Sequence, residues 1–383
     1  MAQQHLEPTE PLLAGPVTGD ALAGYLRAQA TEFLRALRLH RESGGTTAAG
    51  PGAGPDAEDP VDAARALRRS LRRISASLHT FRPLLDADWS ESLRPELAWL
   101  SGTLGMEHAY ESRLERLLLA LHRLSGAVFP SQTVGTGAAA SAAGVAAGSR
   151  AAGAAPDPKR AAQQSAGSPS HPAAPDRGNL TVGAAKAGAL LDRQLTLART
   201  RAHSTALQAL GSSRFHAVAD CIAVLASEVP LTQTAPTTDL HPLATAAEER
   251  LTDAVTALPL VTAGHPYNAE ALIHGLSPDP APHPQDAPWH QVRLLLRLHR
   301  YAREVLQGTG APVDVRLLDA GQALDRHRDA SEAAAAAAQA ARTPRIAPAT
   351  AYALGVLHAD QRHEVEAARF AFQQSWQKQP VNT

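Results

Sequence analysis

Arginine recurs at helical spacing in two separated segments of the chain, and each row has few acidic neighbours. The rows lie in residues 61–73 and 289–301, at Arg65, Arg68, Arg69, Arg72 and Arg73 and then at Arg293, Arg297 and Arg300. The two rows superpose at a constant offset, because 293 − 65, 297 − 69 and 300 − 72 all equal 228. Guanidinium groups present planar, multidentate donors that suit phosphate oxygens. A row of them used twice suggests a binding site for a long polyanion.

Each row falls on one side of its own predicted helix. On a helical wheel the first row forms a stripe about 140° wide, opposite the apolar residues of the same segment. The second row spans roughly 80° together with His290, and Tyr301 lies beside it. Each segment is therefore predicted to be an amphipathic helix whose polar face is almost purely cationic.

A solvated charged face is the plain alternative for any single basic helix. Such a face normally intersperses Glu among the basic residues, four positions away from them. Here Asp62 is the only acid between Val61 and Leu85, and the second row has no acid before Glu304. Like charges at this spacing also repel by roughly a few tenths of a kcal/mol per pair. Since the arrangement also occurs twice, we favour a binding function over a solvated face.

The composition limits the kind of partner and of core. The 383 residues carry a net charge of −1, whereas a non-specific nucleic-acid binder is usually strongly basic. A local basic channel remains compatible with this balance. Aromatic residues make up only 4%, so the core must be built from Leu, Ala and Val, which favours close-packed helices. Arginine greatly outnumbers lysine, but together with the alanine excess this is typical of a high-GC bacterial genome, so we give the ratio no functional weight.

Apolar residues recur at helical spacing through most of the chain, and strand signals are nearly absent. Helices are predicted at about 20–42, 59–81, 93–124, 180–225 with a break near Gly211, 244–258, 288–306, 313–342 and 350–377. The fold class is therefore predicted to be all-α.

One long segment has a different composition. Residues 130–179 are Ala, Gly, Ser and Pro with scattered charges and no apolar period. Such a segment cannot bury enough surface to offset its chain entropy, so we expect a disordered linker. It would join a first helical half, 19–129, to a second, 180–377. Residues 1–18 are expected to be a disordered N-terminus, and residues 378–383 a tail.

The compartment is indicated by what the sequence lacks. The single cysteine, Cys221, rules out an intrachain disulfide and suits a reducing cytoplasm. The N-terminus has neither the basic nor the apolar region of a signal peptide. No strongly apolar run is long enough to span a bilayer. We therefore expect a cytoplasmic protein with no membrane partner.

Enzyme signatures are also missing. The sequence has no phosphate-binding Gly-x-x-x-x-Gly-Lys-[Ser/Thr], no Gly-x-Ser-x-Gly and no Gly-x-Gly-x-x-Gly entering a helix. Its 17 histidines include no His-Glu-x-x-His and no Cys/His cluster, so neither a metal nor another cofactor is predicted. We expect a protein that is not an enzyme, and any phosphohydrolase would act in trans.

Several short motifs occur in a characteristic order. They are the two arginine rows, Leu104-Gly105, the stretch 210–215, the stretch 322–329 and the stretch 351–355. Together these motifs resemble the CHAD family (conserved histidine α-helical domain) over most of residues 20–377. The resemblance implies two four-helix bundles related by a pseudo-twofold repeat, with a basic groove between them. It also implies binding of inorganic polyphosphate and association with polyphosphate granules.

The resemblance assigns roles to individual residues. The family's ladder is similar to His-x-x-Arg-x-x-x-[Lys/Arg]-x-x-Arg-Tyr, which falls on residues 290–301 and, in the first half, on positions 65, 69 and 72. Arg214 matches a basic position at the start of a helix, where the helix dipole favours anions. His327 either lines the same groove or forms inter-helix hydrogen bonds. The expected polyphosphate-binding residues are Arg65, Arg68, Arg69, Arg72, Arg73, Arg214, His290, Arg293, Arg297, Arg300, Tyr301 and His327.

The sequence also departs from the family pattern. Asp62 occupies the first-half histidine position, and His108-Ala109 replace the Arg-Asp expected after Leu104-Gly105. Three alternatives stay open: a module for nucleic acid or another polyanion, a phosphate-ester enzyme, or a divergent scaffold that has lost polyphosphate binding. The departures and the neutral net charge support the third. The scarcity of aromatic residues disfavours stacking on single strands. The expected partners are inorganic polyphosphate and a polyphosphate-metabolising enzyme acting in trans.

Overall fold

The computed structural model describes residues 16–45, 60–126, 175–265, 273, 275–276, 283–308 and 314–377, with the side chains of 43–45, 60–62 and 175–180 left out. Its helices are α1 (Gly19–Gly45), α2 (Pro60–Thr80), α3 (Ala87–Ser125), α4 (Pro175–Leu210), α5 (Ser213–Ser227), α6 (His241–Thr256), α7 (Leu260–Ala263), α9 (Ala287–Gln307), α10 (Val315–Ala341) and α11 (Pro348–Gln377). Within these ranges the only β pairing is an isolated bridge between Leu85 and Leu231. The all-α prediction is confirmed.

The helix bounds differ from the predicted ones mainly at helix starts. The third helix begins at Ala87 rather than at Leu93, because the Asp86 side chain accepts a hydrogen bond from the Trp89 amide and so caps an extra turn. α4 begins at Pro175, inside the predicted linker. The rest of that linker, residues 130–174, lies outside the described residues, as do residues 1–15 and 378–383.

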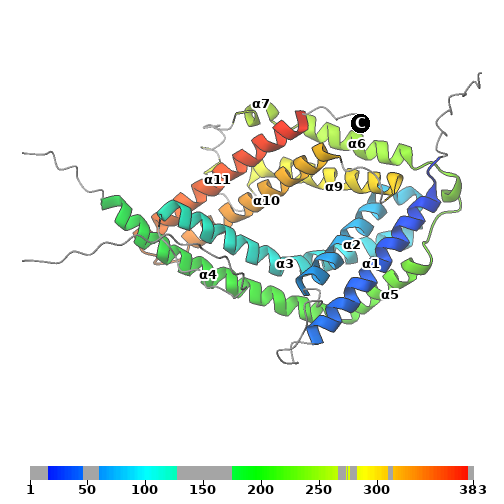
Figure 1. Cartoon of the computed structure of the whole chain (residues 1–383), viewed down its shortest axis with the longest axis horizontal. Coiled ribbons are helices and arrows are strands. Elements are labelled where there is room, and N and C mark those ends of the chain that lie inside the picture. Colours follow the sequence, from blue (N-terminus) through cyan, green and yellow to red (C-terminus); the bar gives the residue numbers. More distant parts are fainter. Residues whose placement is uncertain are drawn as a thin grey trace, which may run out of the picture.

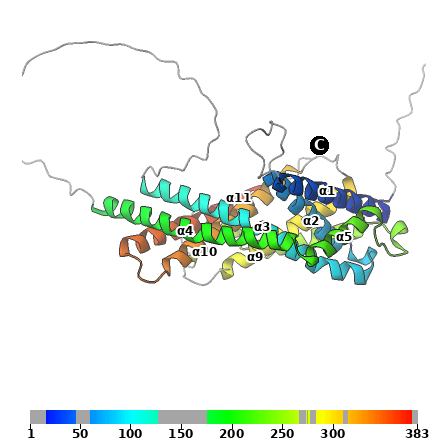
Figure 2. The same ribbon diagram turned by 90° about the horizontal axis from the view of Figure 1, so that it is seen from below.

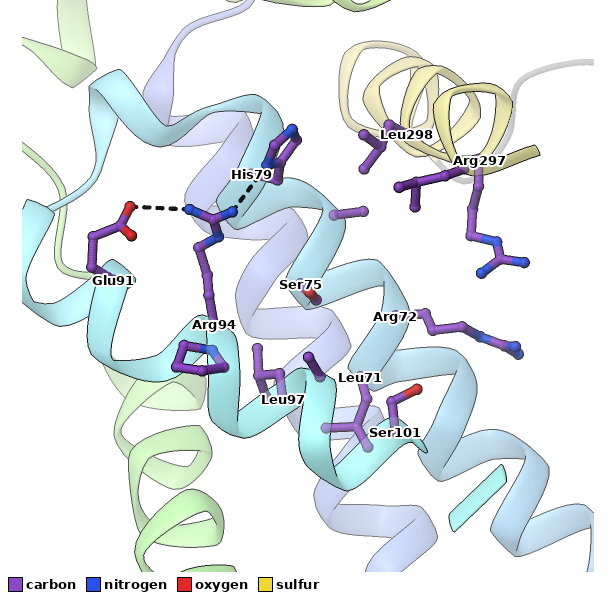
Figure 3. Close-up of a pocket in the computed structure, with 14 residues that line it drawn as sticks. Leu71, Arg72, Ser75, His79, Glu91, Arg94, Leu97, Ser101, Arg297 and Leu298 are labelled. Carbon is purple, nitrogen blue, oxygen red and sulfur yellow. Dashed lines mark hydrogen bonds and ion pairs between the residues drawn. The ribbon is translucent and has the colours of Figure 1, made fainter. Parts of the chain in front are cut away.

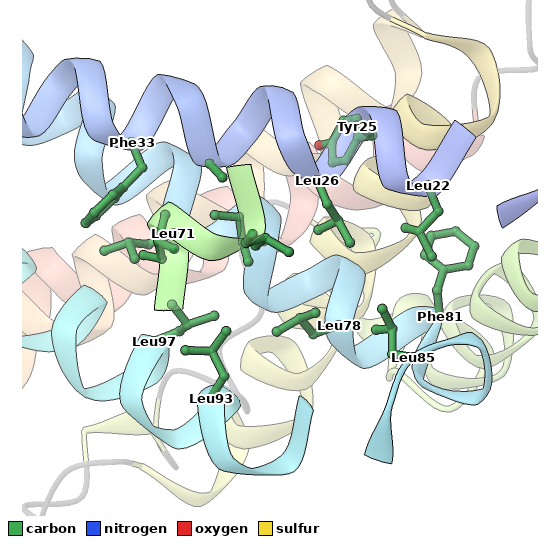
Figure 4. Packing of buried hydrophobic residues seen from close by; sticks show 14 of the residues in the cluster. Leu22, Tyr25, Leu26, Phe33, Leu71, Leu78, Phe81, Leu85, Leu93 and Leu97 are labelled. Carbon is green, nitrogen blue, oxygen red and sulfur yellow. The ribbon is translucent and has the colours of Figure 1, made fainter. Parts of the chain in front are cut away.

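Three hydrophobic cores hold the helices together. The first joins α1, α2, α5 and the beginning of α3 around Phe33, Phe81 and Phe215 (Figure 4). The second joins the end of α3 to α4, α10 and α11. The third joins α6, α9, α10 and α11 around Trp289 and Phe372. The first two cores combine helices from both sides of the predicted linker.

The longest helices pass from one core to the next. α3 contributes Leu97 to the first core and Leu121 to the second. α9 contributes Leu296 to the third core and Val305 to the first, and α10 connects the third core with the second. In Figure 1 the helices therefore surround the centre of the molecule, with α2, α3, α9 and α10 nearest to it. Figure 2 shows that the whole arrangement is flat and elongated.

Small residues bring the helices of the second core close together. Ala333 and Ala337 of α10 are fully buried, and the low volume of alanine allows a short distance between helix axes. Gly183 of α4 lies against α11, where a Cβ atom would be only 2.1 Å from the carbonyl oxygen of Ala349. A side chain at position 183 would push the two helices apart.

No single helix within the described residues is both long and apolar enough to cross a bilayer. The consecutive segments Thr181–Leu210 and Ser213–Ser227 meet these criteria only when taken together, and they are bent by 61° where they join.

Candidate anion-binding site

The two ladder helices bury their apolar faces and leave their arginine rows outside the cores. α2 buries Leu67, Leu71 and Leu78, all in the first core, as the helical spacing predicts. α9 likewise buries Val292 and Leu296 in the third core. The arginines between these positions are half-buried or exposed.

Arginines from three helices surround one small cavity, which we call the arginine cavity. Its volume is about 290 Å³, and it is lined by Arg72, Arg293, Leu296, Arg297, Arg300, Tyr301, Gly321, Asp325, Arg328 and Asp329. Gly321 of α10 makes room for the ladder, since a Cβ atom there would lie 3.4 Å from Nη1 of Arg300. One arginine of the first row, Arg72, and three of the second row therefore line the same concavity.

A larger cavity of about 730 Å³ adjoins the first, between α2, α3 and α9 (Figure 3). We call it the α3 cavity. Arg72 and Arg297 line both cavities, and in Figure 3 their guanidinium groups extend from α2 and α9 on the same side. These two arginines therefore stand at the junction of the cavities.

The clustered arginines lower one another's pKa values. Burial is the largest cause of the lowered pKa of Arg68, and the charges of Arg72, Arg65 and Arg328 add to it. Burial is also the main cause for Arg297, to which Arg72 and Arg328 contribute from the other two helices. Repulsion between helices distant in the sequence shows that the fold concentrates positive charge here. A multivalent anion would relieve that repulsion.

Some of the guanidinium groups lack protein acceptors. Nε of Arg68 and Nε of Arg72 are buried, and neither has a hydrogen-bond partner among the described residues. A buried donor without an acceptor costs about 1–3 kcal/mol. Within the same part of the chain, Arg72, Arg297 and Arg300 form no ion pair. The oxygens of a bound anion would supply the missing acceptors.

Carboxylates from α10 neutralise one side of the arginine cavity. Nε of Arg293 donates to Oδ1 of Asp325 at 2.5 Å. Arg328 forms an ion pair with Asp329. Burial tends to lower the pKa of Arg328, but Asp329 and the other nearby carboxylates raise it overall. The expectation of few acidic partners therefore holds within each ladder helix but not for the folded site, because α10 supplies the acids.

A match to a protein-family model shows which family the chain belongs to. The family model described as CHAD domain matches residues 28–338. The chain belongs to the CHAD domain family. It is similar to a solved structure, "PptA from Streptomyces chartreusis", with 66% identity and a TM-score of 0.70 over 95% of this chain and 100% of that one. The predicted family membership is confirmed.

A second solved structure also matches this CHAD protein. It is a crystal structure of the CHAD domain from the plant Ricinus communis, with 16% identity and a TM-score of 0.46 over 96% of this chain and 97% of that one. The comparison with curated proteins gives no match.

The first ladder of this CHAD protein is arranged differently from the predicted alignment. Positions 65, 69 and 72 were aligned with the second ladder, but Arg69 is exposed and lines neither cavity. Arg68 is instead the half-buried residue in electrostatic contact with Arg72 and Arg328. Identical spacing in the sequence therefore does not give identical contacts. The side chain of Asp62 lies outside the described residues.

Arg73 forms an ion pair with Glu304 of α9 and does not line either cavity. Its Nε donates to Oε2 of Glu304 at 2.7 Å, and the guanidinium carbon lies 5.5 Å from the centre of the Tyr301 ring. The Tyr25 hydroxyl donates to the same Glu304 oxygen at 3.0 Å. Arg73 therefore ties α1, α2 and α9 together. This placement does not agree with its predicted role as a phosphate ligand.

Arg214 likewise has other partners. Its Nε donates to Oε2 of Glu96 at 2.6 Å, and its guanidinium carbon lies 4.0 Å from the centre of the Trp99 ring. It lines neither the arginine cavity nor the α3 cavity. Arg214 therefore joins the start of α5 to α3. Its predicted anion-binding role finds no support in the geometry.

His327 is buried rather than available to a ligand. Only 1% of it is exposed, its ring stacks on Trp289, and its Nε2 lies 3.3 Å from Nε of Arg369, which donates to it. The inter-helix alternative is therefore correct. The sequence carried a signal for this, because Leu324 and Ala330, three positions away on either side, belong to the apolar face of α10. Arg328, the next residue, is the cavity residue that the prediction missed.

His290 lines neither cavity, but it interacts electrostatically with Arg293 and Arg328, which line the arginine cavity. It is half-buried, and burial is the main cause that lowers its pKa, with Arg293 adding to the effect and Asp286 opposing it. Its ring centroid lies 5.4 Å from that of His327. His290 should therefore be neutral at physiological pH when no anion is bound.

A buried ionic cluster anchors the beginning of the second ladder helix. Asp286, directly before α9, accepts from Arg362 and Arg369 of α11, each at 2.7 Å. Arg369 also donates to Glu366 at 2.7 Å. Burial tends to raise the pKa of Asp286, but the two arginines and His327 lower it overall. The cluster fixes the position of α9, and so of its arginines, relative to α11.

Proposed function

We propose that this CHAD protein binds inorganic polyphosphate in the arginine cavity and is not an enzyme. The observation that supports the proposal most strongly is the convergence of Arg72, Arg297 and Arg300 on one concavity without carboxylate partners in the described part of the chain. Unpaired, partly desolvated guanidinium groups favour an anion that brings several phosphate groups together.

A linear phosphate chain fits this arrangement better than a single phosphate does. The contributing residues lie on three helices, so one small anion reaches only part of the cluster, whereas a chain can contact arginines on all of them. Each further phosphate releases more counterions and adds its own charge-assisted hydrogen bonds. The affinity should therefore rise with chain length.

The charge distribution and the size of the cavity disfavour nucleic acid as the ligand. The net charge of −1 and the carboxylates of Asp325 and Asp329 restrict the positive surface to the cavities. A nucleic-acid duplex is too wide for a cavity of about 290 Å³ and would contact its rim alone. Among the described residues, no group of three or more His, Cys, Asp or Glu side chains is arranged to hold a metal ion.

Calorimetric titration tests the proposal. The protein is titrated with orthophosphate, inorganic triphosphate and long-chain polyphosphate at several salt concentrations, and a DNA duplex is used as competitor. The proposal expects affinity to increase with chain length and to weaken steeply with salt. Equal, weak affinity for orthophosphate and long chains contradicts it. Displacement of polyphosphate by the duplex would favour a general polyanion module, and absence of all binding a divergent scaffold.

The same proposal extends to location in the cell. A protein that binds long-chain polyphosphate should accumulate on polyphosphate granules, where a polyphosphate-metabolising enzyme would act in trans. A fluorescent fusion should co-localise with stained granules, and the double substitution Arg72→Ala and Arg297→Ala should disperse it. Unchanged co-localisation of the double variant would separate granule association from the arginine cavity.

A further inference from the structure

The α3 cavity has two chemically different ends with an apolar wall between them. Arg72 and Arg297 form one end, and His79, Glu91 and Arg94 lie at the other (Figure 3). The wall between the ends consists of Leu71, Ala76, Leu97, Ala98, Leu294 and Leu298. The proposed polyphosphate site accounts for the arginine end only.

The far end offers both a donor and an acceptor to a polar ligand. Arg94 donates through Nη1 to Oε1 of Glu91 at 3.0 Å and through Nη2 to Nδ1 of His79 at 3.1 Å. A guanidinium group only donates, so Nδ1 of His79 must be unprotonated and Nε2 carries the N–H. Arg82 also contacts Oε1 of Glu91, at 2.8 Å. The lone pairs of Glu91 Oε2 are therefore left for another donor.

Burial and the neighbouring positive charges both favour the neutral form of His79. Burial is the main cause that lowers the pKa of His79, and Arg94, Arg250 and Arg82 lower it further, against the opposing effect of Glu91. A neutral imidazole beside a carboxylate suits an uncharged polar group better than another phosphate. The two ends of the cavity therefore differ in the chemistry that they recognise.

The apolar wall indicates an organic group between the two ends. Leu294 is a large apolar side chain on the solvent-facing side of α9, and 48% of it is exposed. Ala98 of α3 is also exposed and lines the same cavity. A bare phosphate chain gains nothing from apolar contacts, whereas pockets lined mainly by apolar residues with a few polar groups are typical of small organic ligands. The volume of about 730 Å³ lies in the usual range for such ligands.

The length of the cavity indicates the size of that group. Arg72 and His79 are seven residues apart on α2, which corresponds to a rise of about 10 Å. This is comparable to the extent of a nucleoside between its base edge and its 5′ oxygen. A triphosphate attached there would reach the junction of the two cavities.

We propose that the α3 cavity binds a nucleoside triphosphate. The phosphates contact Arg72 and Arg297, and the ribose and base lie against Leu294 and Ala98, with the polar edge of the base towards His79 and Glu91. The inference goes beyond the proposed function, although it shares these two arginines with it. Long-chain polyphosphate and the nucleotide are therefore expected to compete at the junction.

The first experiment compares ATP with inorganic triphosphate by calorimetry, without added divalent cations. Inorganic triphosphate carries at least as much negative charge as ATP, so electrostatics alone would favour it. Contacts of the nucleoside should make ATP bind at least about tenfold more tightly, which corresponds to about 1.4 kcal/mol. Equal affinities, or tighter binding of inorganic triphosphate, overturn the inference.

Two substitutions locate the nucleoside. Ala98→Phe fills the cavity from an exposed helix position, and Leu294→Ser removes the exposed part of the wall, so neither should unfold the protein. Both should abolish the preference for ATP over inorganic triphosphate. Ala223→Phe, at an exposed position of α5 outside the cavity, should retain it. A preference that survives in both cavity variants overturns the inference.

The outcome can be separated from that of the polyphosphate proposal. Both cavity variants should keep their affinity for long-chain polyphosphate within about threefold, because the arginine cavity is unchanged. If the wild-type protein binds no polyphosphate but prefers ATP, the nucleotide site stands alone and the proposed function fails. If it binds polyphosphate without any preference for ATP, the nucleotide site fails and the proposed function stands.

Discussion

Removing Arg297 should weaken polyphosphate binding far more than removing Arg73, although both belong to the predicted ladders. Arg297 lines both cavities and forms no ion pair in the described part of the chain, so its charge is available to a ligand. Arg73 lines neither cavity and already binds Glu304 at 2.7 Å. The structure thus ranks two residues that the sequence treats alike.

The magnitude follows from the contacts that each variant loses. A hydrogen bond to a charged group is worth about 1.5–3 kcal/mol, so Arg297→Ala should reduce the affinity by about tenfold to a hundredfold. Solvent screening at physiological salt favours the lower part of that range. Arg73→Ala removes no phosphate contact, and its long-range effect should stay below about threefold.

The free energy of unfolding should change more in Arg73→Ala than in Arg297→Ala. Arg297 is repelled by Arg72 and Arg328, so replacing it with Ala should leave the free energy of unfolding nearly unchanged or raise it. Arg73→Ala instead leaves the partly buried Glu304 without its ion-pair partner, which should cost about 1–2 kcal/mol.

The assay combines two measurements on each variant. Polyphosphate affinity is measured over a series of salt concentrations, and Arg297→Ala should reduce the salt slope by about one. Urea unfolding without ligand gives the stability. Arg38→Ala, at an exposed position of α1 that pairs with Glu42, is the matched control for loss of one charge. Unchanged affinity for Arg297→Ala, or an equal loss for Arg73→Ala, would refute the assignment of the arginine cavity.

Three further predictions concern the surroundings of the cavity. The pKa of His290 is lowered in the free protein, and bound phosphates should raise it. Polyphosphate affinity should therefore increase as pH falls from 8 towards about 5. In calorimetry, the affinity of His290→Gln should depend less on pH. Asp325→Asn should release Arg293 and raise the affinity severalfold in the same titration, whereas a loss would assign Asp325 to the site. Asp286→Ala should cost about 3–5 kcal/mol in urea unfolding, because it leaves Arg362 buried without its counter-charge; a loss below 1 kcal/mol would contradict this.

Local sequence was sufficient to predict the elements and the faces of the helices. The spacing of Leu67, Leu71 and Leu78 fixes which side of α2 is buried, and the arginines between them must then lie outside the core. The same reasoning predicted α9, and the order of the motifs identified the family. The helices and their buried faces depend on residues within a few positions of one another, whereas the family depends on the order of motifs along the whole chain.

The partners of each arginine could not be predicted in this way. Arg68 and Arg69 are adjacent on the same polar stripe, yet Arg68 is half-buried and in electrostatic contact with Arg328, whereas Arg69 is exposed and lines neither cavity. Asp325 and Glu304 pair with Arg293 and with Arg73, respectively, across helices that the sequence does not place relative to one another. Such contacts depend on the angles and distances at which helices pack.

The sequence by itself determined that this protein is all-α, that it belongs to the CHAD family and that two of its helices carry cationic faces. Helical periodicity, which acts over one or two turns, sets the helices and their faces, whereas the family follows from the order of motifs along the chain. Only the tertiary structure decided which arginines face the shared cavities, which are neutralised by carboxylates, and that His327 is buried. Those outcomes depend on interactions between charges and surfaces of different helices, whose strength is set by their separation in space rather than in sequence.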